Sequence, residues 1–248
     1  MENVLTRTIS LVSRDCDFTG CWKPSEIFMA MQELAAEHSG ILGAGYAFMR
    51  SKSLAFALTR TELHMSAYPR IGEKVVCRTW AAPVMKWMYP RYFLFETEAG
   101  EPLGYAGTIW VLLNLTERKM VAPAELGVDI AVGDLPAPLR MPGKALAPAA
   151  GETREYLPGY SEIDVNHHVN NTRYVSWMCD ALGTDFFAAH RIDTLIVNYS
   201  HEILPGQPVT LRWESDESGF RMTGDHGDVN HFTLSGRAGS ACIHEQSR

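Results

Sequence analysis

Two apolar stretches, residues 27–36 and 174–182, carry non-polar side chains on most faces, which is typical of a helix covered by other elements. Each stretch is followed by shorter runs rich in β-branched and aromatic residues, which Gly, Pro and Asp separate. These runs predict strands at residues 54–65, 74–82, 87–96, 103–115, 194–201, 208–214, 220–224 and 231–237. One buried helix followed by antiparallel strands, used twice, predicts an α+β fold.

The two halves of the chain are distant copies of one another. Asp17 corresponds to Asp164, and residues 6–7 correspond to residues 153–154, with the same offset of 147 residues. In this register Pro24 suits the first position of the first helix, and Asn170 suits the N-cap of the second. The sequence therefore predicts an N-terminal half at residues 1–121, a linker rich in Ala, Pro and Gly at residues 122–152, and a C-terminal half at residues 153–248.

Composition narrows the classes of function. A chain of 248 residues with 46% hydrophobic side chains is ordinary for a globular protein, and a net charge of −7 argues against nucleic acid as the main partner. Five cysteines without paired spacing are expected to be free thiols in a reducing cytosol. The apolar runs are far shorter than the ~20 residues that span a bilayer. The first residues lack a signal peptide, so we expect a cytoplasmic protein.

The most informative polar cluster comes directly before the second apolar stretch. Asp164, Asn166 and His168 lie within five residues, and Asn170 and Asn171 follow them. Carboxylate, amide and imidazole groups activate water and stabilise an oxyanion. The start of a helix adds free N–H groups and a partial positive charge. The cluster predicts acyl-transfer or hydrolytic chemistry, although no nucleophile is obvious within it.

The pattern Asp-x-Asn-x-His-Val-Asn-Asn-x-x-Tyr, which runs from Asp164 to Tyr174, resembles the catalytic segment of acyl-acyl-carrier-protein (acyl-ACP) thioesterases. Glu202 falls where that family carries a catalytic glutamate. The next position, often Cys in the plant enzymes, is Ile203, which argues against a cysteine nucleophile. The resemblance implies a tandem, or double, hot-dog fold, in which each half wraps an antiparallel sheet around a long helix. Plant members begin with a transit peptide that this sequence does not show, so we expect a bacterial protein.

The resemblance also implies a catalytic set of Asp164, Asn166, His168 and Glu202, with water as the nucleophile. Glu202, His168 or the two in concert would activate the water, and the sequence does not separate their roles. Asn166 would position water or donate to the oxyanion, and Asp164 would orient Asn166 or His168. Backbone N–H groups near Asn170 and Asn171 would complete the oxyanion hole.

The first half keeps the pattern of the fold but not the polar cluster. Thr19 and Cys21 stand at the positions of the motif amide and imidazole, and Tyr68 stands opposite the expected catalytic glutamate. We therefore expect a single active site in the second half. The first half is then free to shape an apolar slot for the acyl chain, for which the candidate side chains are Phe28, Met31, Met85 and Trp87.

The expected function is hydrolysis of fatty acyl-ACP thioesters to free fatty acid and holo-ACP, which terminates chain elongation in fatty acid biosynthesis. The alternatives are an acyl-CoA thioesterase, a hot-dog hydratase or dehydratase, and a non-catalytic acyl-binding protein. Zinc-type spacings are absent, and we expect neither a metal nor a cofactor. A monomer or a homodimer is compatible with two paired halves. An acidic carrier would need a local basic patch, and the candidates are Lys86, Arg91, Arg118, Lys119, Arg173 and Arg191.

Overall fold

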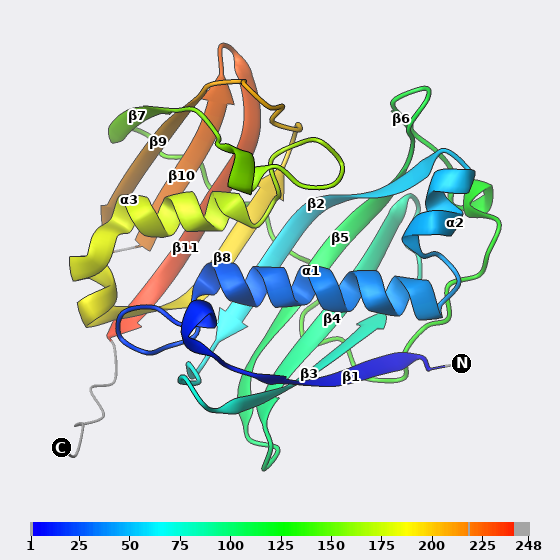
Figure 1. Ribbon diagram of the computed structural model, residues 1–248, viewed down its shortest axis with the longest axis horizontal. Helices are drawn as coiled ribbons and strands as arrows, with labels where there is room; N and C mark the ends of the chain where they lie inside the picture. Colours follow the sequence, from blue (N-terminus) through cyan, green and yellow to red (C-terminus); the bar gives the residue numbers. More distant parts are fainter. Residues whose placement is uncertain (1, 218, 241–248) are drawn as a thin grey trace.

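Two long helices lie on one face of a continuous antiparallel sheet in the computed structural model, which describes residues 2–217 and 219–240 (Figure 1). The helices are α1 (Pro24–Ile41) and α3 (Arg173–Ala189), and a short helix, α2 (Tyr46–Ser51), follows α1. The strands are β1 (Val4–Ser10), β2 (Leu54–Met65), β3 (Lys74–Ala81), β4 (Met88–Thr97), β5 (Pro102–Asn114), β6 (Lys119–Met120), β7 (Glu152–Tyr156), β8 (His190–Tyr199), β9 (Val209–Asp216), β10 (Gly219–His226) and β11 (Val229–Ser240).

The strand order is β1-β3-β4-β5-β2-β8-β11-β10-β9-β7, and β6 pairs with β5. Strands β2 and β8 join the two halves in one sheet, with Arg60 opposite Asn198 and His64 opposite Thr194. All eight predicted strands are present, with ends that differ by a few residues. The predicted α+β class is therefore confirmed, and the two helices cover the same face of the sheet.

Helix α1 is buried along one stripe. Pro24 occupies its first turn, as predicted, where the missing N–H costs nothing. The buried residues recur every three or four positions and face the sheet, whereas Glu33 and Glu37 on the other side are exposed. The helix therefore packs against α3, β3 and β1 and leaves its other side exposed, so it is less enclosed than its apolar sequence predicts.

Helix α3 begins later than the sequence predicts. Its N-cap is Thr172, so the prediction that Asn170 caps the helix is wrong. Asn170 Oδ1 instead accepts hydrogen bonds from the backbone N and the Oγ1 of Thr172, at 2.9 Å each. This Asx turn satisfies donors just ahead of the helix and fixes the angle at which the preceding loop enters it.

The loops that lead into the two long helices have the same construction. Each contains a 3-10 turn, at Ser13–Asp15 and at Tyr160–Glu162. Each then closes with an isolated β-bridge, Cys16 with Trp22 in the first half and Ile163 with Val169 in the second. The offset from 16 to 163 and from 22 to 169 is 147 residues in both cases, which confirms the predicted repeat.

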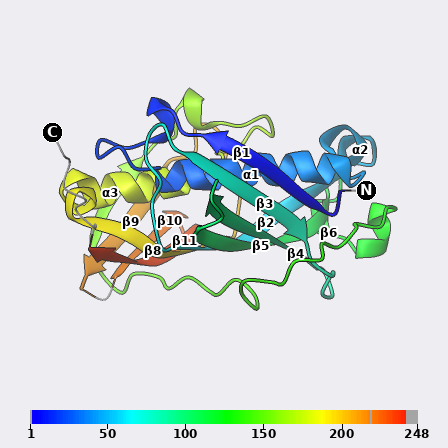
Figure 2. The same ribbon diagram turned by 90° about the horizontal axis from the view of Figure 1, so that it is seen from below.

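The segment between the halves crosses the face of the sheet opposite the helices, as Figure 2 shows along its lower edge. Its backbone N–H groups donate to polar side chains that point out of that face: Gly143 to Glu62 Oε2 and Ala145 to Asn198 Oδ1, each at 2.6 Å. We call residues 127–151 the strap. It spans the junction of β2 and β8, so it holds both halves from the outside.

Candidate functional site

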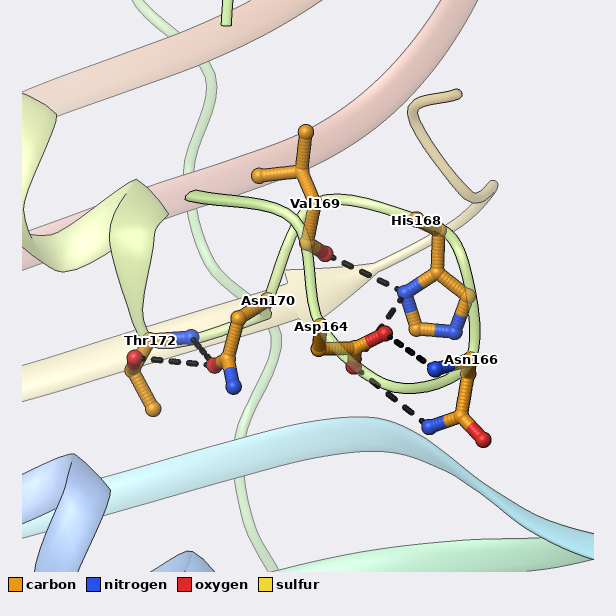
Figure 3. Close-up of polar contacts among 6 residues, drawn as sticks. All are labelled: Asp164, Asn166, His168, Val169, Asn170 and Thr172. Atoms are coloured by element: carbon orange, nitrogen blue, oxygen red, sulfur yellow. Dashed lines mark hydrogen bonds and ion pairs between the residues drawn. The ribbon is translucent and has the colours of Figure 1, made fainter. Parts of the chain in front are cut away.

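Asp164 organises the loop that leads into α3 (Figure 3). Its Oδ1 accepts the backbone N–H of Asn166 at 2.8 Å, and its Oδ2 accepts the Asn166 side-chain amide at 3.4 Å. The same Oδ2 lies 3.6 Å from His168 Nδ1, and the backbone N–H of Asp164 donates to His168 O at 2.9 Å. The structure therefore brings Asp164, Asn166 and His168 together around one carboxylate.

The surroundings of His168 define its neutral tautomer. Its Nδ1 lies 3.2 Å from the carbonyl oxygen of Val169, which can only accept, and faces the carboxylate of Asp164. Nδ1 must therefore carry the hydrogen when the ring is neutral. Nε2 is then left with a lone pair that can take a proton from water, and Figure 3 shows this nitrogen turned away from Asp164. This is the orientation that a general base needs.

Glu202 lies in the neighbouring loop, between β8 and β9. The backbone N–H of Val169 donates to Ile203 O at 2.8 Å, and this bond holds the two loops side by side. Glu202 Oε2 forms an ion pair of 3.2 Å with Arg118 Nη2, which comes from the first half. Within residues 2–217 and 219–240, no hydrogen bond or ion pair joins Glu202 directly to His168.

Tyr174 lies beneath both loops. It is fully buried and stacks on Phe232, with ring centroids 4.2 Å apart. Burial raises the pKa of Tyr174, and the nearby Tyr199, Asp164 and Glu202 raise it further. The phenol therefore stays protonated and brings no charge into the buried cluster to which it belongs.

Glu162, which lies outside the motif that begins at Asp164, anchors this loop to its neighbours. Its carboxylate accepts from Trp177 Nε1 at 2.6 Å, from Tyr156 Oη at 3.0 Å and from Gly159 N at 2.8 Å. The repeat could have revealed it, because Asp15 stands 147 residues earlier and caps the corresponding turn by accepting from the backbone N–H of Val12.

The first half repeats this loop without its chemistry. Asp17 Oδ1 accepts the backbone N–H of Thr19 at 2.8 Å, and Trp22 N donates to Pro69 O at 2.9 Å. The latter bond corresponds to that between Val169 and Ile203, so Tyr68 lies opposite Glu202. Arg191 fills the remaining space and donates to Thr19 Oγ1 at 2.6 Å. This position holds the partly buried phenol of Tyr68 and the buried thiol of Cys21 in place of a carboxylate and an imidazole.

The side chains predicted to hold the acyl chain lie in two different environments. Phe28 and Met31 are buried in a core cluster that also contains Val169 and Tyr174. Met85 and Trp87 are half-exposed on the loop between β3 and β4 and belong to neither buried cluster. Asn170 forms the Asx turn, and Asn171 is partly exposed just ahead of α3. The structure does not bring Met85 and Trp87 together with Phe28 and Met31.

Two of the basic residues proposed for docking are unsuitable. Arg91 is buried, and its guanidinium donates to His38 Nδ1 at 2.8 Å. Arg191 is occupied inside the first-half loop, where it also donates to the carbonyl oxygen of His190 at 2.7 Å. Those two predictions are wrong. Among the others, Arg118 contacts Glu202, and Lys119 follows it in the chain. Arg173 donates to the carbonyl oxygen of Ser161 at 3.2 Å, just ahead of the site loop.

The described residues contain no group of three or more His, Cys, Asp or Glu side chains arranged to hold a metal ion. None of their helices is both long and apolar enough to cross a membrane.

Known sequences resemble both halves of the chain. The sequence profile of the acyl-ACP thioesterase N-terminal domain matches residues 2–126, and that of the C-terminal domain matches residues 146–237. A chloroplastic palmitoyl-acyl carrier protein thioesterase from Gossypium hirsutum is 29% identical over 188 residues, covering 69% of this chain and 45% of the relative. A chloroplastic dodecanoyl-[acyl-carrier-protein] hydrolase from Umbellularia californica is 28% identical over 187 residues, covering 69% of this chain and 49% of the relative.

Solved structures share the fold. An acyl-ACP thioesterase from Bacteroides thetaiotaomicron superimposes with a TM-score of 0.86 at 22% identity, over 96% of this chain and 98% of the other. The 12:0-ACP thioesterase from Umbellularia californica gives a TM-score of 0.81 at 22% identity, over the same shares of the two chains. These similarities confirm the tandem hot-dog fold that the resemblance implies. The aligned part of the chain spans about half the length of the plant relatives. Because both domain profiles match and together cover most of the sequence, the chain belongs to the acyl-ACP thioesterase family.

Proposed function

We propose that this protein hydrolyses fatty acyl-ACP thioesters and releases free fatty acid and holo-ACP. The observation that carries the proposal is the loop of residues 164–168, in which one carboxylate holds both an amide and an imidazole whose Nε2 has no hydrogen-bond partner among the described residues. The names of the family and of its plant relatives give the substrate class. Chain termination in fatty acid synthesis follows from this reaction, and we propose that it takes place in a bacterial cytoplasm.

In the proposed reaction, a water oxygen attacks the thioester carbonyl carbon while His168 Nε2 or Glu202 takes its proton. The carbonyl oxygen becomes an oxyanion, which the amide of Asn166 and N–H groups near Asn170 and Asn171 stabilise. The C–S bond then breaks, and the phosphopantetheine sulfur leaves as a thiolate that needs little protonation. Asp164 supports the reaction by orienting Asn166 and His168.

A cysteine nucleophile is a poor alternative on physical grounds. Burial raises the pKa of Cys179, so its sulfur stays a thiol at neutral pH. Cys21 is buried in the first-half loop, where Arg191 lies 3.6 Å from its sulfur. Neither thiol is placed in the candidate site.

The test is release of free thiol from acyl-ACP and acyl-CoA of matched chain length. His168→Ala and Glu202→Ala should each lower kcat by about a hundredfold, as loss of a general base typically does, and should keep the wild-type Tm. Cys21→Ala is the matched control, because Cys21 occupies the position of His168 in the first half. Near wild-type turnover in both Ala variants would refute the site. Preference for acyl-CoA would support the acyl-CoA alternative, and binding without thiol release would support an acyl-binding protein.

A further inference from the structure

Arg118 is a residue of the first half that reaches the candidate catalytic carboxylate of the second. It lies at the tip of the hairpin between β5 and β6 and is separated from Glu202 by 84 residues. Its Nη2 lies 3.2 Å from Glu202 Oε2, although 77% of the Arg118 side chain is exposed. Among the described residues, this is the ion pair that Glu202 forms.

The backbone of Arg118 is unusual for an arginine. Its φ of 54° lies in the left-handed region, which a hairpin of this kind usually fills with Gly. Asn114 Oδ1 accepts the backbone N–H groups of Thr116 and Glu117, at 2.9 and 3.0 Å, and so fixes the turn that leads to this residue. Lys86 and His167 adopt the same left-handed conformation, so this angle alone assigns no role to a side chain, and the turn only fixes where the Arg118 side chain starts.

Arg191, which lies on β8 and contacts the first-half loop, has a different environment. Arg191 donates to Thr19 Oγ1 and to the carbonyl oxygen of His190, and it is half-buried. Its bonds tie a loop together, as expected of a structural side chain. Among the residues that the structure describes, Arg118 forms its ion pair with a carboxylate that is itself 46% exposed.

We propose that Arg118 is a positioning residue for the reaction: it holds the Glu202 carboxylate toward the loop of residues 164–168. The proposal rests on the proposed function. An exposed ion pair contributes little to folding. Its value here is geometric, because Glu202 lies in an open loop between β8 and β9, and a cation from the opposite half limits its orientations.

The main test compares Arg118→Gly and Arg118→Gln on acyl-ACP and on a small neutral thioester that has no carrier. We expect kcat to fall by the same factor on both substrates. The lower limit is about fivefold, which corresponds to the free energy of an exposed ion pair. The upper limit is about a hundredfold, which is the loss of rate when a reacting group is misplaced by about 1 Å. Added guanidinium should restore part of the activity of Arg118→Gly and none of that of Glu202→Gln. The control is Arg14→Gln, an 87% exposed arginine elsewhere in the first half.

Stability separates a positioning role from a structural one. Arg118→Gly removes the side chain but relieves the left-handed backbone, so its Tm should equal or exceed that of wild type while its kcat falls. Lys86→Gly, at another left-handed position with φ of 59°, gives the gain in Tm from the backbone alone. A fall in kcat that tracks a lower Tm would overturn the proposal. A loss confined to acyl-ACP and abolished by salt would make Arg118 a docking residue, and would overturn it as well.

Melting temperatures test the contact between Arg118 and Glu202 without any measurement of turnover, so the contact can be judged even if the proposed function fails. If wild type releases no thiol from any acyl thioester, the proposed function fails. The pairing is then tested by the Tm values of Arg118→Gln, Glu202→Gln and the double variant. A double variant whose Tm change differs from the combined single changes supports contact between the two side chains, and strict additivity overturns it.

Discussion

The backbone of His167, in the site loop, has a positive φ angle that is unfavourable for an L residue. Its φ is 64°, and the equivalent residue of the first half is Gly20, with φ of 78°. An L side chain in this region is disfavoured by about 1–2 kcal/mol, part of which Gly gives back through its greater freedom in the unfolded chain. We predict that His167→Gly raises the free energy of unfolding by about 0.5–1 kcal/mol, measured by urea denaturation, and leaves kcat unchanged.

The control for this prediction is Gly20→Ala. A Cβ at Gly20 would lie 3.9 Å from Ile71 Cγ2, so space is sufficient and the positive φ alone should lower stability, by about 1 kcal/mol. A loss of stability in His167→Gly would show that the imidazole makes a contact that outweighs the backbone strain.

The polar trio at residues 164–168 could be predicted because its spacing lies within one loop. Spacing alone could not reveal the pairing of Arg118 with Glu202, since a contact over 84 residues depends on how the two halves meet. The exposure of Met85 and Trp87 was missed for a related reason. Apolar side chains are common on hairpin loops, and no local pattern separates them from those that line a pocket.

At the scale of elements, the predicted strands were those with an apolar inner face. Strand β1 has only one fully buried residue, and β7 has none, since its sequence Glu-Thr-Arg-Glu-Tyr is almost entirely polar. Both lie at the ends of the sheet, where a strand needs fewer apolar side chains. They could not be predicted from periodicity because pairing with an existing strand, rather than burial, holds them in place.

Helix α1 is tied to β4 by a buried polar pair whose charge state depends on pH. His38 Nδ1 accepts from Arg91, and its Nε2 donates to the carbonyl oxygen of Glu2 at 3.0 Å, so the ring is satisfied only when neutral. Burial lowers the pKa of His38, with the Arg91 charge adding to the effect, and burial lowers the pKa of Arg91 to about 10.

Because the pKa of His38 is lower in the folded protein than in the unfolded chain, the unfolded chain binds the proton at a higher pH as the pH falls. We therefore predict that stability is complete above the unfolded pKa of about 6.5 and falls as the pH drops below it, by at most about 1.4 kcal/mol per pH unit. Thermal melts between pH 7.5 and 5.0 measure the slope. His38→Gln should flatten it, and an unchanged slope in that variant would assign the effect elsewhere, with buried His231 as the next candidate because burial also lowers its pKa.

The same helix offers a test of where the acyl chain lies. Phe28 and Met31 belong to the core cluster that reaches the site through Val169 and Tyr174. We predict that Phe28→Leu and Met31→Ala shift the preferred acyl chain length while thiol release continues. Each buried methylene contributes about 0.8 kcal/mol, so two of them change the ratio of kcat/KM values roughly tenfold.

The matched control for chain length is Met178→Ala, an equally buried methionine on α3. Chain-length profiles and Tm values should be recorded together, because large-to-small changes in a core also destabilise it. If only the α3 variant moves the optimum, the second half forms the acyl pocket.

At the scale of the whole molecule, the negative net charge of the chain disfavours binding of an acidic carrier protein. The chain carries a net charge of −7, and an acidic carrier would be repelled except where it meets exposed basic side chains, for which Lys86 and Lys119 are candidates. We predict that kcat/KM for acyl-ACP falls about tenfold between low and high salt, as for steered encounters. Hydrolysis of a small neutral thioester should change little. Equal salt dependence for both substrates would rule out electrostatic docking.

The pairing of β2 with β8 bears on how the sequences of the two halves can differ at equivalent positions. Glu62 faces Ile196 there, and the offset from 62 to 196 equals that from Tyr68 to Glu202, so the two are the same position in each copy. An approximate twofold axis passes between them. In a symmetric dimer, a glutamate at this place would meet its own copy and be repelled. In a single chain the two positions can carry different residues. Glu62 accepts a hydrogen bond from the strap, and Ile196 is apolar. The loops of the two halves can likewise differ in sequence, so that one of them can carry the polar cluster without the other.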